Sequence, residues 1–345
     1  MSYRLRISLA VGAAFLVANA RAQEPAPGTA AEATSTAPAP EGAPAPAPPP
    51  PLRKGPRTLN GMVFQPTSVL SGPFTTTEFS SLTQLGSGNA NAPTFNLQGQ
   101  QTGNKDYPVA AFGQVIELGL LLTPDISIRL SANALLFTGT NGLSLLISGV
   151  TAQTGFGAGL TAGKNIGKTM RLSFVGDVGL SPQFSALIGN AILNAVQTGV
   201  FSQDGLYSEV RQVKGNPGLS FAWAPLEALG FVAEVRYVWT RLVGNGEVSQ
   251  RITQGVSVGG AIGFDLDPLV HFPLGLQASY RYDIPTGNRG IAEVQQGGLG
   301  FYYTRRVNLA LGLEAQFRHG DIRPGVEPTL RADMGIGTVQ FHYYW

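Results

Sequence analysis

The chain has 345 residues, of which 43% are hydrophobic and only 13% are charged, with 45 glycines, 24 prolines and no cysteine. So low a charged fraction argues against a pair of ordinary soluble domains, and a net charge of +2 gives no general field for nucleic acid. The lack of cysteine excludes disulfides, thiolate metal sites, cysteine nucleophiles and a lipidated cysteine.

Residues 1–22 are predicted to be a secretory signal peptide. Arg4 and Arg6 precede an apolar stretch, 7–17, and Ala20 and Ala22 supply the small residues of a cleavage site. The alternative, a membrane-anchoring helix, would need about 20 apolar residues. We expect a mature chain that begins near Gln23.

Residues 23–57 are predicted to be a disordered Pro/Ala-rich linker in the periplasm. The segment holds 11 of the 24 prolines and too little apolar surface to fold. A role as a polyproline ligand or a cell-wall contact is the alternative to a plain spacer.

Residues 58–345 are predicted to form one β-barrel, because alternation with period 2 recurs over segments of about 10 residues. In the clearest segment, 126–136, Ile126, Leu130 and Leu136 oppose Ser127 and Arg129. The twelve expected strands are 58–65, 108–122, 126–137, 154–163, 168–180, 209–224, 230–242, 249–265, 273–283, 291–303, 306–318 and 334–345.

Alternation fits both a soluble barrel and a transmembrane one, and two features favour the membrane. The three tryptophans, Trp223, Trp239 and Trp345, fall near strand ends on the apolar parity, as in aromatic girdles, whereas Phe137 has the opposite parity. Short connections such as 123–125 also alternate with longer ones such as 181–208, which is typical of periplasmic turns and outer loops.

The C-terminus points the same way. Val339, Phe341, Tyr343 and Trp345 alternate with polar residues up to the last position. This ending resembles that of Gram-negative outer-membrane β-barrel proteins, whose last strand usually ends in an aromatic residue. The resemblance implies an outer-membrane location, contact with outer-membrane lipids and insertion by the barrel-insertion machinery through the final strand. It says nothing of substrate, and the oligomeric state stays open.

Charged residues of both signs are predicted on the lumen parity: Glu117, Arg129, Arg171, Asp177, Glu234, Arg236, Arg281 and Glu314. Unpaired charges in a low-dielectric wall are costly, so we favour an ion-pair network that holds the barrel, with a polar pore as the alternative. Glycines on the same parity, such as Gly159 and Gly259, leave room for a channel or an inserted loop.

No enzyme, cofactor or metal site is expected. A Gly-x-Ser-x-Gly match at 255–259 lies within a regular strand, where a nucleophile elbow cannot form. His319 with Asp321 is the only acid–base pair in a suitable place, and turn chemistry explains it as well. Three scattered histidines offer no metal-ligand spacing.

Outer loop 181–208 contains an apolar pattern at helical spacing and no charge from Ser181 to Gln203. We predict a helix there that packs with the stretch 143–150 as a lid over the barrel, or that also binds hydrophobic ligands. The candidate contacts are Phe184, Leu187, Ile188, Ile192 and Val196. In this the chain loosely resembles outer-membrane transporters of hydrophobic compounds, but those carry more strands and an N-terminal plug, and no plug motif is found here.

The function favoured by the sequence is passive, porin-like transport of small solutes, hydrophobic ones among them. The alternative is a barrel that does not conduct and has a structural or surface-interaction role. No nucleic-acid partner is expected.

Overall fold

The computed structural model describes residues 53–95, 100–141, 145, 149–186, 207–244, 251–286, 291, 293–321 and 331–345. The predicted signal peptide and most of the predicted linker therefore lie outside the described residues. The last linker residues, 53–57, are described and contact the barrel, and Arg57 is buried there.

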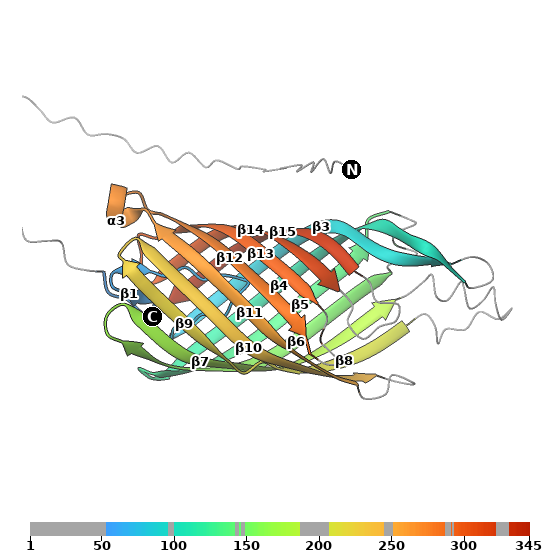
Figure 1. Ribbon diagram of the computed structural model, residues 1–345, viewed down its shortest axis with the longest axis horizontal. Helices are drawn as coiled ribbons and strands as arrows, with labels where there is room; N and C mark the ends of the chain where they lie inside the picture. Colours follow the sequence, from blue (N-terminus) through green and yellow to red (C-terminus); the bar gives the residue numbers. More distant parts are fainter. Residues whose placement is uncertain are drawn as a thin grey trace, which may run out of the picture. The chain divides into compact units, whose positions relative to one another are not determined.

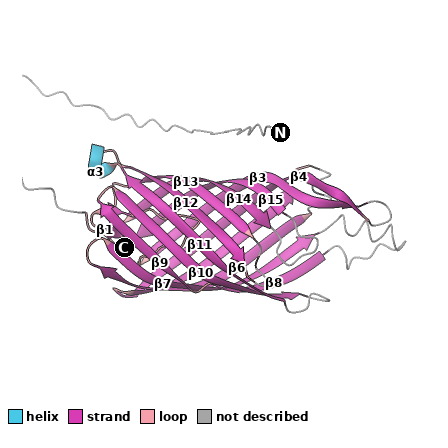
Figure 2. Cartoon of the chain, in the orientation of Figure 1, coloured by secondary structure: helices cyan, strands magenta, loops and turns pink. Residues whose placement is uncertain are grey.

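The described chain is almost entirely β-strand, as Figures 1 and 2 show. The strands are β1 (Thr58–Leu59), β2 (Met62–Val63), β3 (Glu78–Phe95), β4 (Gln101–Thr123), β5 (Ile126–Gly139), β6 (Val150–Ile166), β7 (Met170–Ala186), β8 (Tyr207–Gly215), β9 (Gly218–Leu226), β10 (Leu229–Gly244), β11 (Arg251–Asp265), β12 (Leu274–Pro285), β13 (Val294–Tyr303), β14 (Leu309–Asp321) and β15 (Arg331–Tyr344). A short helix, α3 (Asp267–Val270), lies between β11 and β12. Among the described residues, no helix has the length and hydropathy needed to cross a membrane.

The strands from β3 to β15 form one closed antiparallel sheet. Each pairs with its sequence neighbour, and β15 pairs with β3 over the full length of β15 to close the ring. β8 and β9 occupy a single strand position between β7 and β10, because Pro217 lacks an N–H and interrupts the ladder there. The barrel therefore has twelve strand positions, which confirms the predicted count.

One expected strand is wrong. The segment 58–65 is no part of the barrel wall: it forms the hairpin β1–β2, whose tight turn has positive φ at Asn60 (49°) and Gly61 (82°). The first barrel strand is β3, within a predicted loop. β3 was missed because its outward residues at 81, 83, 87 and 89 are Ser or Asn or Thr, so the two faces differ little in polarity.

Outward and inward residues otherwise follow the predicted parity. On β15, Phe341 and Tyr343 are exposed while Gln340 and His342 are buried. The exposed outward side chains are large and apolar on nearly every strand, and Trp223, Phe264, Phe301 and Trp345 lie near the ends where the connections are short. This apolar exterior around a polar interior is that of a barrel surrounded by lipid.

The two ends of the barrel differ in the length of their connections. The short-turn end carries the connections 124–125, 167–169, 227–228, 266–273 and 304–308, together with the C-terminus. The long-connection end carries 96–100, 140–149, 187–206, 245–250, 286–293 and 322–330. The longest connections, 140–149 and 187–206, lie at one end as predicted, but the expected long connection 66–107 contains β3 and the start of β4, so only 96–100 connects strands there.

Candidate functional site

The lumen holds a plug, which we define as residues 53–77. Figure 1 places β1, its first strand, beside the C-terminus at one end of the barrel. Most of its apolar side chains are buried, with Met62 and Val63 at 1% and 0% exposure. The prediction that the chain lacks a plug is therefore wrong, and of the two uses foreseen for the lumen glycines, an inserted loop is present.

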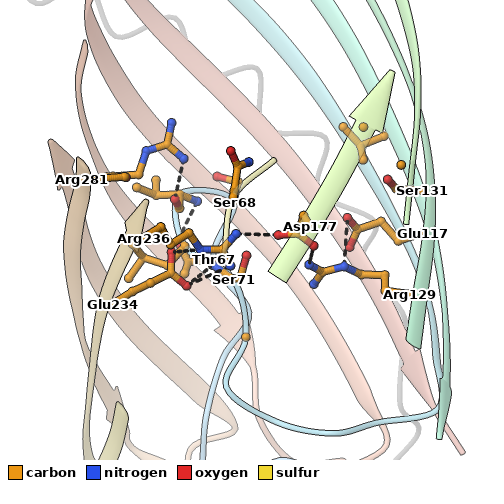
Figure 3. A pocket seen from close by; sticks show the side chains of 18 of the residues that line it. Thr67, Ser68, Ser71, Glu117, Arg129, Ser131, Asp177, Glu234, Arg236 and Arg281 are labelled. Carbon is orange, nitrogen blue, oxygen red and sulfur yellow. Dashed lines mark hydrogen bonds and ion pairs between the residues drawn. The ribbon is translucent and has the colours of Figure 1, made fainter. Parts of the chain in front are cut away.

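The plug is fastened in the middle of the lumen by polar side chains of the wall. Ser68 donates through its hydroxyl to Glu314 Oε2 on β14, at 2.7 Å. On β10, Glu234 Oε2 accepts from the backbone N–H of Ser71, at 3.2 Å. Figure 3 shows Ser68 and Ser71 of the plug in the lumen near Glu234. Two of the predicted lumen charges therefore hold the plug.

Arg171 fastens the end of the plug to β7. Its Nε donates to the carbonyl oxygen of Pro73 at 2.9 Å and its Nη2 to Thr75 Oγ1 at 2.9 Å. Arg171 is buried and lies within 4.0 Å of no described carboxylate, so hydrogen bonds, the ring of Phe74 and the more distant Asp125 compensate its charge. Arg171 is thus a plug anchor and not a member of the expected ion-pair network.

The start of the plug is held by two further arginines. Arg53 forms ion pairs with Asp265 (2.5 Å) and Asp267 (3.3 Å) at the short-turn end. Arg57 donates to the carbonyl oxygens of Phe64 and Leu309. These two residues were predicted to close a disordered linker, and the described part of that segment is instead bound to the barrel.

Small residues on the wall make space for the apolar side chains of the plug. A Cβ built on Gly259 of β11 would lie 2.4 Å from Leu70 Cδ2, and one on Gly230 of β10 would lie 2.9 Å from the ring of Phe64. Nothing larger than glycine fits at either position while the plug keeps its place. Ala222 and Ala224 of β9 complete the seat of the hairpin.

A chain of ion pairs crosses one side of the lumen and joins five of the charged residues that were predicted on the lumen parity. Asp177 on β7 is its centre, with Arg129 Nη2 at 2.6 Å and Arg236 Nη1 at 2.5 Å. The chain continues from Arg129 to Glu117 at 3.9 Å and from Arg236 to Glu234 at 2.9 Å. Through Glu234 it reaches the plug.

Arg129 and Asp177 lie on strands that are not neighbours. β6 runs between them, and its Gly159 is in register with both residues. A Cβ on Gly159 would lie 2.4 Å from Asp177 Oδ1, so the ion pair passes directly over this glycine. The glycine therefore allows a charge contact across three strands.

A cavity of about 890 Å³ lies inside the barrel. Its lining runs from plug residues such as Ser68 past the ion-pair chain to Lys214 and Arg318 on the far side. The space is therefore bordered by the plug as well as by the wall, and most of the residues that line it are polar or charged.

A hydrophobic cluster closes part of the lumen toward the long-connection end. Phe137 packs there with Tyr107, Val109 and Met334, all buried. The exceptional parity of Phe137 in the sequence thus has a structural reason, because its ring faces the lumen and not the lipid.

The predicted lid lies almost wholly outside the described residues, including Leu187, Ile188, Ile192 and Val196. Phe184 is described and is not helical: β7 continues to Ala186, and the Phe184 side chain is exposed on it. At Leu145, in the other apolar stretch, backbone hydrogen bonds of helical type link Asn141, Leu145 and Gly149.

The residues considered for catalysis are placed as strand residues. Ser257 lies within β11 and donates to Asp283 Oδ1 at 2.7 Å, so the Gly-x-Ser-x-Gly match forms no sharp turn. His319 contacts Asp333 on the neighbouring strand, Nδ1 to Oδ1 at 2.5 Å, and both are exposed. No cluster of three or more metal-ligating residues occurs in the described part of the chain.

No family model and no curated protein matches the sequence. Among solved structures, the chain is similar to the translocator domain of the autotransporter NalP from Neisseria meningitidis, at 10% identity and a TM-score of 0.46 over 78% of this chain and 89% of that one. The chain is also similar to the β domain of the Bordetella autotransporter BrkA, at 12% identity and a TM-score of 0.45 over 77% of this chain and 99% of that one. For an outer-membrane channel of Pseudomonas putida F1, the identity is 11% and the TM-score is 0.42 over 82% of this chain and 100% of that one.

At such identities and TM-scores these likenesses do not distinguish one function from another. The fold assignment rests on the closed strand pairing and on the lipid-type exterior of this chain. Together they define a transmembrane β-barrel of twelve strands, the class that the C-terminal resemblance implied, with a plug in its lumen.

Proposed function

We propose that this protein is an outer-membrane barrel through which small solutes diffuse passively, with the plug as its gate. The observation that supports the proposal is the cavity of about 890 Å³, lined by polar side chains on both sides of the plug. Wet, charged walls of this kind favour polar solutes over bulk apolar ones. The short-turn end and the linker are then periplasmic.

The plug is held largely by hydrogen bonds, each of which contributes about 0.5–1.5 kcal/mol, or about 1.5–3 kcal/mol where a charged group takes part. Individual anchors such as Ser68–Glu314 can therefore exchange with water without unfolding the wall. A gate needs contacts of this moderate strength.

The number of those anchors also favours the second candidate function, a plugged barrel that does not conduct and serves a structural or surface role. Arg53 and Arg57 of the plug bind the wall, and Arg171, Glu234 and Glu314 of the wall bind the plug. A plug fixed at so many points would keep the lumen closed.

Planar-bilayer recording of the full chain separates the two functions. Because the natural chain has no cysteine, Ser68→Cys with Glu314→Cys gives a pair that a short, cleavable bifunctional thiol reagent can bridge. We expect the reduced double variant to conduct, the bridged form to lose conductance, and cleavage of the bridge to restore it. Ser68→Cys alone, treated with the same reagent, is the control.

Liposome swelling with small neutral sugars gives a second readout of the same passage. A wild-type barrel that shows neither conductance nor swelling, and a Leu70→Asp variant that is folded and equally silent, would establish the non-conducting alternative. Leu70 is buried against Val69 and Ala261, so an aspartate there should expel this part of the plug.

A further inference from the structure

Three cations converge on the cavity from three separate strands. They are Lys214 on β8, Arg281 on β12 and Arg318 on β14, and all three line the space beyond the plug. Lys214 interacts electrostatically with both arginines, and Arg318 with Arg281. Like charges held this close repel one another, so their convergence needs a compensating partner.

Asp283 is the carboxylate that interacts with both Lys214 and Arg318, whereas Glu234 interacts with Arg281 but is already paired with Arg236. Asp283 forms an ion pair with Arg281 Nε at 3.2 Å and accepts a hydrogen bond from the hydroxyl of Ser257 at 2.7 Å. Arg281 also donates through Nη1 to the carbonyl oxygen of Val69 in the plug, at 3.1 Å. Asp283 therefore neutralises Arg281, and the local charge of three cations and one anion is 3 − 1 = +2.

Lys214 and Arg318 remain without a carboxylate partner once Asp283 is paired with Arg281. Neither forms a hydrogen bond or an ion pair with any residue in the ranges that the structure describes, and Arg318 Nε is buried without a partner. Other arginines of the lumen have partners: Arg129 and Arg236 each contact two carboxylates, and Arg171 is held by hydrogen bonds to the plug. Lys214 and Arg318 differ from these arginines because they lack both kinds of contact within the described part of the chain.

We infer that Lys214, Arg281 and Arg318 form an anion-binding site in the lumen, which selects small solutes carrying an oxyanion, either a carboxylate or a phosphate. An arginine fork binds two oxygens of such a group, and the lysine ammonium adds a mobile point charge. Rings of Arg and Lys are the usual basis of anion selectivity in pores. The inference rests on the proposed function, since it names the solute class that the same lumen passes.

The position of Arg281 links the site to the plug. Its guanidinium contacts Val69 of the plug and Asp283 of the wall, so an anion bound at Lys214 and Arg318 also attracts the group that holds the plug. The site therefore lies at the contact between the gate and the open lumen.

The test is the reversal potential of the full chain in a planar bilayer under a gradient of potassium chloride. We expect the sign that indicates preference for chloride, and a shift to zero or to cation preference in Lys214→Gln with Arg318→Gln. Arg211→Gln is the matched control: Arg211 lies on the same strand as Lys214 but is exposed and paired with Glu209. It should keep the reversal potential of the wild type.

Acetate and inorganic phosphate, added separately, identify the oxyanion. Each that binds should reduce the chloride current of the wild type and leave the double variant unaffected. A wild type without chloride preference, or a double variant with the wild-type reversal potential, would overturn the inference while leaving passive transport intact.

A wild type that does not conduct at all contradicts the proposed function instead. The site is then tested by equilibrium dialysis of radiolabelled phosphate and acetate against the protein in neutral detergent. Binding to the wild type and to Arg211→Gln that the double variant loses supports the site, and no binding to the wild type overturns it.

Discussion

Asp177 is the residue whose replacement should cost the barrel most stability, because two arginines depend on it. Its two carboxylate oxygens accept from Arg129 at 2.6 Å and from Arg236 at 2.5 Å. The change Asp177→Asn keeps the shape of the side chain but replaces one of the two carboxylate oxygens by an NH2 group, which cannot accept a hydrogen bond. One arginine therefore keeps a weaker hydrogen bond to the remaining oxygen, and the other arginine faces the NH2 donor.

The magnitude follows from those two losses. Replacing a charge-assisted bond by a neutral one costs about 1 kcal/mol, and leaving a buried donor without its acceptor costs about 1–3 kcal/mol. We expect Asp177→Asn to lower the free energy of unfolding by about 2–4 kcal/mol. Arg129 is left with Glu117 at 3.9 Å, which is too far for a good hydrogen bond.

The assay is equilibrium unfolding in guanidinium chloride of barrels refolded into lipid vesicles, with heat-modifiable gel mobility as the measure of folded protein. Asp333→Asn is the control, because Asp333 also contacts a side chain of the neighbouring strand, His319, but is 78% exposed. It should unfold close to the wild-type midpoint. If Asp177→Asn unfolds at the midpoint of the control, the ion-pair chain does not stabilise the barrel and the argument fails.

Three further outcomes are expected. Gly259→Leu should displace Leu70 and make the plug sensitive to added protease while the barrel keeps its heat-modifiable mobility; a resistant plug would mean that Gly259 is not its seat. Val178→Arg, at an exposed outward position midway along β7, should make the free energy of folding into vesicles less favourable by about 2–4 kcal/mol, with Val178→Leu as control. Ser257 should not be labelled by a fluorophosphonate, because its hydroxyl is bound to Asp283 within a regular strand; labelling abolished by Ser257→Ala would show a nucleophile instead.

The wall of the barrel could be predicted from the sequence because lipid imposes a strict period. Every outward position must be compatible with hydrocarbon, so in strands such as β5 and β15 the alternation shows which residues face the lipid and which face the lumen. β3 escaped prediction because its outward Ser81 and Thr83 are polar, and their needs are met locally with Gln114 of β4. A pattern of hydrophobic alternation cannot reveal side-chain hydrogen bonds between neighbouring strands.

The plug was missed for a related reason. Its hairpin carries apolar residues, Leu59 and Met62 to Phe64, between polar ones, and the Asn60-Gly61 turn that separates β1 from β2 was read as part of one strand. The predicted lumen charges divide into two groups that the sequence did not separate. Arg171 and Glu314 bind the plug, whereas Arg129, Asp177 and Arg236 pair with one another.

The glycines of the lumen explain how one wall accommodates both the ion-pair chain and the plug. Gly159 has no side chain, so Arg129 can reach Asp177 across it, and Gly259 leaves the space that Leu70 of the plug occupies. In each case an inward side chain at that register position would occupy the space that another group needs. The placement of inward glycines therefore fixes where the lumen is bridged by charges and where it receives the plug, while the remaining width forms the cavity that Lys214 and Arg318 face. The ion-pair chain reaches the plug through Glu234, and Arg171, Arg281 and Glu314 add further contacts between the wall and the plug.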